Sequence, residues 1–301
     1  MTAKLMDGRK LSELLKPQLR AHARELSDRY GVIPALAAIM VGDNAASAQY
    51  VRNKRKFAEE LGFRSEIIEI PAADASTERL LETIARLNAD EGITGILLQL
   101  PVPEGIDTFR LFDAIDANKD VDAVGAASVS GFYRGHWGSF IPCTPRGVLS
   151  LLDHYKVPVE GRRAAVIGRS DIAGKPMAII LGGRLRNATA TWCHRYTRDL
   201  ADICRESDIV VSCAGVTPPD RPFLITADMI KPGACVIDVG FRRIGRGRFA
   251  GDVDFEGVAQ VAGWITPNPG GTGPMTVVAL MQNVIDAARY RLGLARADYP
   301  I

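Results

Sequence analysis

The chain alternates short apolar runs with segments of helical periodicity, and this alternation constrains the fold more than any other feature. Three apolar runs in the first half are each followed by a helical pattern: runs at 35–41, 65–70 and 93–100, and helices at 47–61, 77–88 and 108–115. Strands that alternate with helices form parallel sheets, and the helices cover the faces of those sheets. The first half is therefore predicted to be an α/β domain.

The alternation restarts in the second half, after a glycine- and serine-rich stretch at 120–141 that is predicted to be irregular. The expected elements are strands at 164–167, 188–192, 209–213, 235–239 and 264–266, and helices at 146–155, 174–185 and 275–291. The chain has 301 residues, and at about 150 residues per domain this length fits two domains. The sequence thus predicts two α/β domains.

The first residues predict an amphipathic helix rather than a targeting segment. Asp7 is placed to cap this helix, and apolar residues follow at helical spacing, at Leu11, Leu14, Leu15, Leu19, Ala23 and Leu26. The segment lacks the apolar core of a secretory signal, and no apolar run approaches the roughly 18 residues of a membrane span. We therefore expect a cytoplasmic protein.

Charge and cysteine content narrow the expected partners and site types. Lys and Arg number 37 against 35 Asp and Glu, and the net charge of +2 gives no reason to expect a nucleic-acid or membrane partner. The cysteines are odd in number and form no C-x-x-C pair, so neither a disulfide framework nor a metal site is expected. We expect them to be small buried hydrophobes: Cys143, Cys193, Cys204, Cys213 and Cys235.

A glycine turn joins the predicted strand at 164–167 to the next helix. Gly168 allows a sharp turn at the strand end, and Gly174 allows close packing or a close approach of a ligand. The start of the helix offers free N–H groups to a pyrophosphate. The spacing is G-x5-G rather than G-x-G-x-x-G, and an ordinary strand-to-helix turn would use the same glycines.

Two arginines near this turn indicate which nicotinamide cofactor would bind. In a doubly wound sheet, the end of the second strand meets the adenosine ribose, where an acidic residue would bind a free 2′-hydroxyl. This chain has Arg195 there, and Arg169 lies in the first turn. Two guanidinium groups suit a 2′-phosphate, which favours NADP over NAD. The alternative is that both are solvated surface arginines.

Polar residues of the first half form a second candidate site. Tyr50 and Lys54 share one helix face, and a lysine partly buried beside an aromatic ring has a lowered pKa that suits proton transfer. Gln99 interrupts an apolar strand near its carboxyl end, where it requires a partner. Asp122 could present a carboxylate to the same crevice, or cap a turn. The neighbouring basic residues are expected to be a solvated face: Arg52, Arg55 and Lys56.

The segment at 265–276 contains three prolines and three glycines and leads into the last predicted helix. Such a loop is rigid, yet it leaves the backbone open to close approach. It could wrap a bound cofactor or substrate, or serve as a linker between domains.

Taken together, nine motifs resemble the bifunctional methylenetetrahydrofolate dehydrogenase/cyclohydrolase family. They are SAQYVRNKRK, GILLQLPVPEGID, KDVD, PCTPRGV, VIGRSDIAGKP, ATATWCHRYT, KPGACVIDVG, GDVDF and TPNPGGTGPMT, in the family's order. The resemblance implies two α/β domains with a cleft between them, and a homodimer. A catalytic folate-binding domain would span 1–140 and be completed by the C-terminal helix at 275–301. A Rossmann-type NADP-binding domain would span 141–274.

The resemblance also implies two reactions and the residues that carry them. NADP⁺ would oxidise 5,10-methylenetetrahydrofolate to the methenyl form, and water would open that cation to 10-formyltetrahydrofolate, without a metal. Lys54 would be the catalytic lysine, and Gln99 would hold and tune it. Tyr50 would stack on the aminobenzoyl ring of the folate, and Asp122 would hydrogen-bond the pterin.

The remaining implied residues belong to the second domain. Three would shape the folate and nicotinamide site: Gly270, Gly271 and Pro274. Six would contact NADP: Gly168, Arg169, Ser170, Gly174, Arg195 and Phe241.

The chain departs from the usual family pattern at several of these places. Ala123 replaces the glycine of D-V-D-G, and the segment at 123–131 lacks the usual asparagine. Asn268 and Thr272 replace valines, and Phe241-Arg242 replaces Ile-Asn. A divergent paralogue with dehydrogenase activity alone, or with a modified pterin substrate, is therefore an alternative. A noncatalytic NADP-binding protein would tolerate loss of Lys54 and Tyr50, and the chain retains both.

Overall fold

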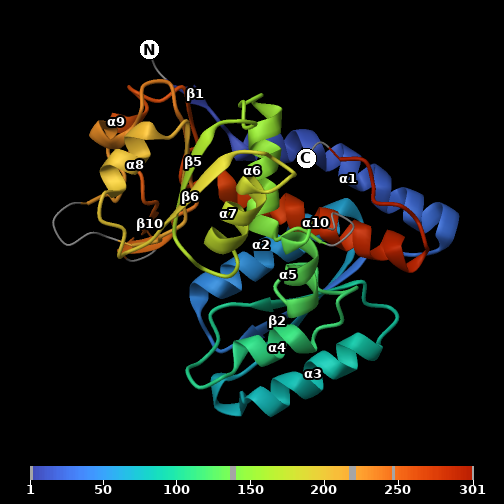
Figure 1. Cartoon of the computed structure of the whole chain (residues 1–301). Coiled ribbons are helices and arrows are strands. Elements are labelled where there is room, and N and C mark those ends of the chain that lie inside the picture. The colour runs from blue at the N-terminus through green and yellow to red at the C-terminus, as the bar shows by residue number, and fades with distance from the viewer. Residues whose placement is uncertain (1–2, 136–139, 217–221, 246–247, 300–301) are drawn as a thin grey trace. The chain divides into compact units, whose positions relative to one another are not determined.

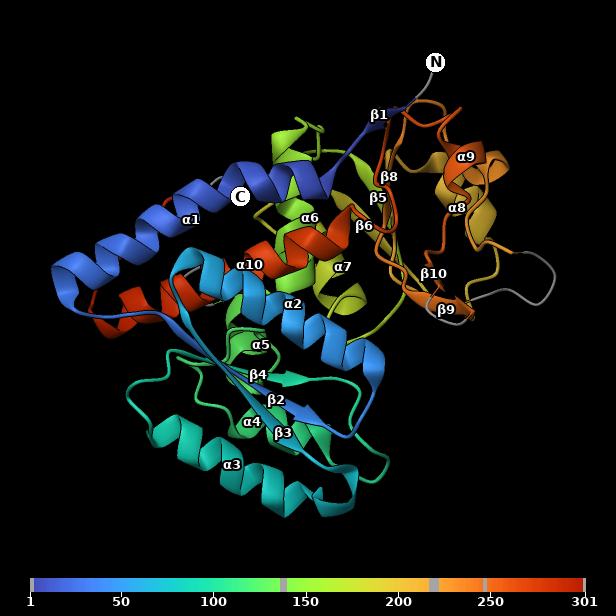
Figure 2. The same ribbon diagram turned by 180° about the vertical axis from the view of Figure 1, so that it is seen from behind.

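The computed structural model describes residues 3–135, 140–216, 222–245 and 248–299. Its contacts divide the chain into two units, which are described separately (Figures 1 and 2). Unit 1 comprises residues 3–14 and 144–276, and unit 2 comprises residues 15–143 and 277–299. Both units are α/β, as the alternation of the sequence predicts.

Unit 2 is built on a three-stranded parallel sheet in the order β3-β2-β4. The strands are β2 (Ala35–Val41), β3 (Arg64–Ile70) and β4 (Gly95–Gln99), and the helices that follow them are α2 (Ala45–Leu61), α3 (Thr77–Ala89) and α4 (Thr108–Ala114). Every residue of the central strand β2 is buried. Side chains of α3 and α4 share a core with one face of the sheet, and Figure 2 shows α2 on the other side. The predicted strands and helices of this unit are confirmed to within a few residues.

The stretch at 120–141 is not wholly irregular, and that prediction is wrong for α5 (Ala126–Tyr133). The Asp120 carboxylate accepts the amide of Gly125 at 2.9 Å, and Ala126 N donates to Asp113 Oδ1 at 2.8 Å. These acceptors satisfy amides at the start of a helix that the local composition disfavours. Residues 136–139 of the stretch lie outside the described residues.

The predicted N-terminal helix is α1 (Gly8–Tyr30). The capping role of Asp7 is confirmed, because Lys10 N donates to Asp7 Oδ1 at 3.0 Å. Five of the six predicted apolar positions are buried, but Leu14 is 54% exposed. Leu14 falls outside the buried stripe of the helix, which its neighbour Leu15 already fills.

Unit 1 contains a six-stranded parallel sheet in the order β1-β11-β8-β7-β5-β6. Its strands are β1 (Lys4–Leu5), β5 (Arg163–Ile167), β6 (Thr189–Cys193), β7 (Ile209–Ser212), β8 (Cys235–Asp238) and β11 (Trp264–Ile265). Its helices are α6 (Cys143–His154), α7 (Gly174–Gly182), α8 (Leu200–Glu206) and α9 (Phe255–Val258), and α10 (Thr272–Arg291) begins in it. An antiparallel hairpin of β9 (Arg242–Gly245) and β10 (Arg248–Ala250) follows β8. Within the described ranges, each helix is too short or too polar to span a bilayer.

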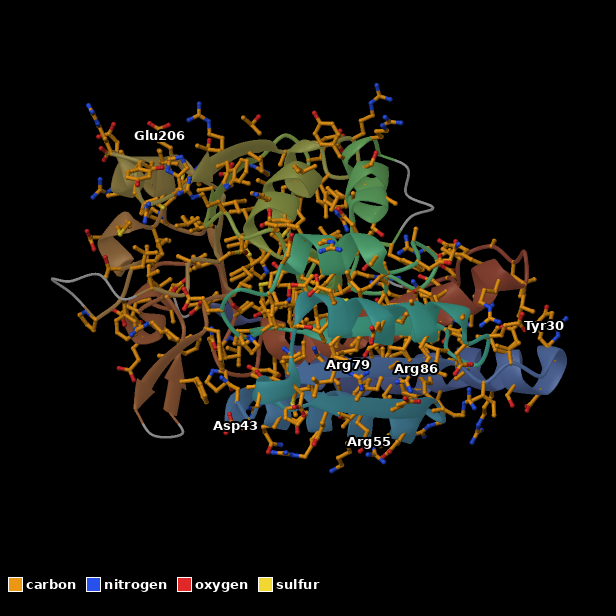
Figure 3. All side chains as sticks on the ribbon, turned by 90° about the horizontal axis from the view of Figure 1, so that it is seen from below. Tyr30, Asp43, Arg55, Arg79, Arg86 and Glu206 are labelled. Carbon is orange, nitrogen blue, oxygen red and sulfur yellow. The ribbon has the colours of Figure 1, made fainter. Side chains whose placement is uncertain are left out.

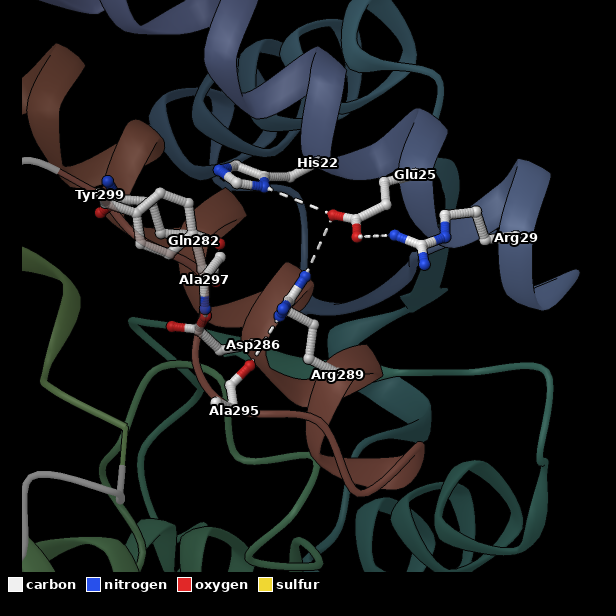
Figure 4. A network of polar contacts seen from close by, with 9 residues as sticks. All are labelled: His22, Glu25, Arg29, Gln282, Asp286, Arg289, Ala295, Ala297 and Tyr299. Carbon is white, nitrogen blue, oxygen red and sulfur yellow. Dashed lines mark hydrogen bonds and ion pairs between the residues drawn. The ribbon is translucent and has the colours of Figure 1, made fainter.

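In unit 2, the residues after α10 are held by a polar network (Figure 4). The fully buried Asp286 accepts from Arg296 Nε at 2.9 Å and from Ala297 N at 3.2 Å. The Tyr299 ring lies edge-on to His22, with centroids 5.3 Å apart. The network fixes the end of the described chain to α10 and α1.

A buried lysine closes the end of α3. Lys119 Nζ donates to Leu87 O at 2.9 Å, Asn88 O at 2.7 Å and Asp90 O at 2.8 Å. These carbonyls lie at the carboxyl end of the helix, where a cation also meets the negative end of the helix dipole.

We expect Lys119→Met to lower the free energy of unfolding by about 2–3 kcal/mol, because three carbonyls lose a charged donor. Urea unfolding monitored by circular dichroism measures this loss. Lys56→Met, on the exposed face of α2, is the matched control and should change stability by less than about 0.5 kcal/mol. Equal effects of the two substitutions would contradict the structural role of Lys119.

Candidate active-site residues

The polar residue at the end of β4 is paired with the lysine of α2. Lys54 Nζ donates to Gln99 Oε1 at 2.9 Å. Gln99 Nε2 in turn donates to Leu100 O at 2.8 Å, which fixes the amide so that its oxygen faces the lysine. The carboxyl end of a buried parallel strand thus holds an oriented acceptor for an ammonium group.

The electrostatic surroundings of Lys54 favour its neutral form. Burial lowers the pKa of the Lys54 ammonium below its ordinary value, because the charged form loses hydration. The charge of Asp122, and after it the electrostatic interaction with Cys143, raise that pKa and offset part of the effect of burial. A lysine in this state can give up and regain a proton nearer neutral pH than an exposed one.

Tyr50 lies one helical turn before Lys54, and its side chain is 39% exposed. Partial burial raises the pKa of the phenol, so this ring stays neutral. The basic residues between and after these two positions are exposed, as expected. Arg55, for example, points away from the ribbon and pairs with Glu59 at 2.7 Å (Figure 3).

Asp122 lies in a turn that its neighbour Asp120 holds in place. Asp120 is 1% exposed, and its carboxylate accepts the amides of Val124 at 3.2 Å and Gly125 at 2.9 Å. Ala123 has φ of 58°, a left-handed conformation that glycine adopts more readily. The chain therefore keeps the backbone shape of a glycine turn at this position without the glycine.

Sequence reasoning missed the roles of Cys143 and of Asn283, which contacts it. Cys143, treated as a buried hydrophobe, is indeed 2% exposed, but its electrostatic interaction with Lys54 also raises the pKa of the lysine. The amide of the buried Asn283 donates to Val121 O at 2.7 Å, Ile141 O at 2.9 Å and Cys143 Sγ at 3.5 Å. These residues are far apart in the chain, so no local spacing could have revealed the group.

In unit 1, the glycine turn after β5 is required by close backbone packing. Gly168 has φ of +126°, and a Cβ there would lie 2.6 Å from Cys213 O. A Cβ on Gly174 would lie 2.4 Å from Gly168 O. Gly174 therefore brings the start of α7 against the strand end, and Gly174 N donates to Ser170 Oγ at 3.3 Å. The turn leads into the start of α7, where the positive end of the helix dipole fits an anionic group.

The structure brings Arg169 and Arg195 to the same aromatic ring. Their guanidinium carbons lie 5.8 Å and 4.7 Å from the centroid of Tyr196. Arg195 also donates to Tyr196 Oη at 2.6 Å. Two cations gathered at the end of β6 fit a 2′-phosphate. The sequence reading missed Tyr196, although it directly follows Arg195.

The other predicted residues of unit 1 lie after β8, in the loop before α10 and in the first turn of α10. Phe241 is 45% exposed and stacks on Phe249, with centroids 4.5 Å apart and an interplanar angle of 17°. Gly270 has φ of +119°, and Gly271 N donates to Pro267 O at 2.8 Å. Pro274 lies in the first turn of α10, where a proline is tolerated.

Two buried carboxyl groups, also missed, join the loops at this sheet edge. Asp252 is fully buried and accepts from Ser212 Oγ at 2.8 Å and Ala214 N at 2.9 Å. Asp238 accepts the amides of Gly240 at 2.9 Å and Asp252 at 3.1 Å. Burial, together with the charge of Asp252, raises the pKa of Asp238 to about 6. The pair fixes the ends of β7 and β8.

Sequence models of two domains match this chain. The tetrahydrofolate dehydrogenase/cyclohydrolase catalytic domain matches residues 6–122, and the NAD(P)-binding domain of the same family matches residues 142–292. The chain belongs to the tetrahydrofolate dehydrogenase/cyclohydrolase family. The resemblance read from the nine motifs is therefore confirmed.

Relatives and solved structures of the family are similar to this chain over nearly its whole length. The bifunctional protein FolD of Burkholderia thailandensis is 50% identical over 96% of this chain and 98% of its own length. The bifunctional FolD of Campylobacter jejuni is 39% identical, with a TM-score of 0.91, over 96% of this chain and 99% of that one. A Trypanosoma brucei FolD solved with NADP cofactor and inhibitor is 37% identical, also with a TM-score of 0.91, over 97% and 99%.

The electrostatic coupling of Lys54 to Asp122 gives a test within the family's catalytic domain. We expect Asp122→Asn to lower the pKa of Lys54 further, because the substitution removes a negative charge that raises it. An NMR titration of ¹³C-labelled lysine side chains measures the shift. Asp43→Asn, at an exposed position of the same unit, should leave it unchanged. An unaltered Lys54 pKa in Asp122→Asn would refute the coupling.

Proposed function

We propose that this chain oxidises 5,10-methylenetetrahydrofolate to 5,10-methenyltetrahydrofolate with NADP⁺ and hydrolyses the product to 10-formyltetrahydrofolate. The observation that carries the proposal is the hydrogen bond between Lys54 and Gln99, beside Asp122, in a chain that both domain models of the family match. A lysine with a lowered pKa and a fixed acceptor has the properties that proton transfer during hydrolysis requires.

The hydrolytic step follows from the chemistry of the methenyl group. Water adds to the cationic carbon between two nitrogens, and its oxygen loses one proton to Lys54 and the second to solvent as the formyl C=O forms. The bond to one nitrogen breaks as that nitrogen is protonated. Neutral Lys54 accepts the proton from water and, as the ammonium, returns one to the departing nitrogen. Gln99 keeps the lysine in position throughout. The net reaction consumes one water and releases one proton.

Tyr50 and Asp122 would orient the folate for both steps. The half-exposed ring of Tyr50 offers a face on which the aminobenzoyl group can stack. The Asp122 carboxylate would accept hydrogen bonds from the pterin. The glycines of the loop before α10, with Pro274, would leave room for the reacting rings: Gly270 and Gly271.

The residues of unit 1 fit NADP, which supplies the acceptor of the hydride when it is bound. The turn at Gly168, Ser170 and Gly174 would hold the pyrophosphate at the start of α7, where the helix dipole favours an anion. Arg169 and Arg195 would bind the 2′-phosphate. Phe241 would contact the cofactor at the end of β8. The protein's part in the oxidation is to orient its two ligands.

The same resemblance supports a cytoplasmic homodimer that acts on a small folate derivative. Light scattering of the purified chain would test the dimer, and a mass equal to a single chain would refute it.

We expect Lys54→Met to reduce cyclohydrolase activity at least 100-fold, since general acid–base catalysis contributes about 10²–10⁴-fold. The decay of methenyl absorbance after mixing enzyme with methenyltetrahydrofolate measures it. Lys56→Met, on the exposed face of the same helix, is the control. Methenyl absorbance should decay at the parent rate with this variant. If Lys54→Met also matches the parent, Lys54 does not carry the hydrolysis.

The oxidation is tested separately, by mixing the parent enzyme with 5,10-methylenetetrahydrofolate and either NADP⁺ or NAD⁺. If no methenyl product forms with either cofactor, the proposed oxidation is refuted.

We expect Arg195→Leu to raise the KM for NADP⁺ about 10-fold or more, because a charge-assisted hydrogen bond contributes about 1.5–3 kcal/mol. The KM for NAD⁺, which has no 2′-phosphate, should stay near the parent value. Initial rates with both cofactors decide this, with Arg198→Leu as a nearby exposed control. An equal loss with both cofactors would contradict the assignment of Arg195 to the phosphate.

A further inference from the structure

Two of the chain's departures from the family pattern form hydrogen bonds to the same strand end. The Thr272 hydroxyl donates to Asp238 O at 3.1 Å. The Asn268 amide donates to Gly240 O at 2.6 Å and also hydrogen-bonds the Asp238 carboxyl group. Valine, the usual residue at both positions, could form none of these bonds. The loop at 266–272 is thus joined to the end of β8 by side-chain contacts that valines would lack.

The strand end that receives these bonds has little freedom to shift. Asp238 N donates to Thr266 Oγ1 at 2.8 Å, and Val239 N donates to Ser212 O at 2.8 Å. A Cβ on Gly240 would lie 2.2 Å from Asp252 Cγ, so the backbone approaches that carboxyl group as closely as glycine allows. The backbone at this end of β8 is therefore held in place, and the loop at 266–272 is held against it.

The loop's other side lies against the start of α1, within the same unit. Arg9 N donates to Gly270 O at 3.1 Å. A Cβ on Gly8 would lie 1.8 Å from Gly271 O, so only a glycine fits between the helix and the loop. These are backbone contacts that a side-chain substitution at Asn268 or Thr272 leaves in place. Toward β8, the two side chains add to the contacts that Thr266 makes at the start of the loop.

We propose that Asn268 and Thr272 are positioning residues for the nicotinamide cofactor, because they hold the loop at 266–272 against the strand end that continues into Phe241. The inference rests on the proposed function, in which Phe241, Gly270 and Gly271 form part of the cofactor and folate site. Neither side chain has to touch the cofactor. Each acts through the backbone that it fixes.

The test compares Asn268→Val, Thr272→Val and Thr272→Ser in the full chain. Each valine variant should raise the Kd for NADP⁺, measured by calorimetry, about 3- to 10-fold, since one or two hydrogen bonds contribute about 0.5–1.5 kcal/mol each. Their kcat at saturating NADP⁺ should stay within about twofold of the parent value. The loss of cofactor affinity should then appear in the KM for NADP⁺ and not in kcat. Thr272→Ser retains the hydroxyl and should restore the parent Kd.

A second readout requires no cofactor. Hydrogen exchange of the Val239 and Gly240 amides, which donate to Ser212 O and Asp238 Oδ1, should be faster in the valine variants of the cofactor-free protein. Unchanged exchange in both variants would show that Asn268 and Thr272 do not hold the loop against β8. Faster exchange with a parental Kd would refute the positioning role.

The readouts also separate failure of the proposed function from failure of this inference. If the parent binds no NADP⁺, the cofactor assignment fails and the positioning role fails with it. The exchange data still report whether Asn268 and Thr272 hold the loop against β8. If Asn268→Val does not fold, Thr272→Val carries the test alone, because threonine and valine have nearly the same shape.

Discussion

A buried polar group at the carboxyl end of a parallel strand must find a hydrogen-bond partner, and both units are organised around this requirement. In unit 2, Gln99 ends β4 and meets Lys54. In unit 1, Asp238 ends β8 and is satisfied by backbone amides and by Asn268. The apolar interiors of the two sheets provide stability but no chemistry. Polar chemistry is concentrated where the strands end and the backbone leaves the sheet.

Two lysines of unit 2 show how the same group can serve structure or reactivity. Lys119 donates to three backbone carbonyls at the end of α3, which uses the full donor capacity of an ammonium. Among the described residues, Lys54 donates to Gln99, and Asp122 and Cys143 act electrostatically on its pKa. A saturated ammonium has no donor to spare for a ligand. Lys54 retains that capacity, and its neighbouring charges adjust its affinity for protons.

Much of the fold could be predicted because the central strands are buried on both faces. The run at 35–41 matches β2 at both ends, since a continuous apolar segment bounded by turn residues has few alternatives. The two-residue strand β1 and the hairpin after β8 were missed, because such short elements leave no periodic pattern. Helix α5 was missed because the amides at its start are satisfied by the carboxylates of Asp120 and Asp113, of which Asp113 lies 13 residues away from its partner Ala126, beyond a short sequence window.

The candidate site was predictable to a different degree in its different parts. Local spacing placed Tyr50 and Lys54 on one helix face, and the interrupted apolar run marked Gln99, but spacing alone could not pair residues 45 positions apart. The roles came from the family resemblance. Neither spacing nor the resemblance identified Cys143 and Asn283. Folding alone brings Cys143 into electrostatic interaction with Lys54, and Asn283 into a hydrogen bond with Val121.

The turn at Ala123 shows how the chain can leave the family pattern without losing its geometry. A left-handed alanine costs roughly 1–2 kcal/mol and persists only where its surroundings determine the backbone. Asp120 supplies that determination on both sides: its carbonyl accepts Ala123 N at 3.1 Å, and its carboxylate accepts the amides of Val124 and Gly125. Because Asp122 lies inside this closed turn, its backbone is held by Asp120 rather than by a glycine. Asp120 thus enforces the strained conformation of Ala123 and keeps Asp122 in a turn from which its charge raises the pKa of Lys54.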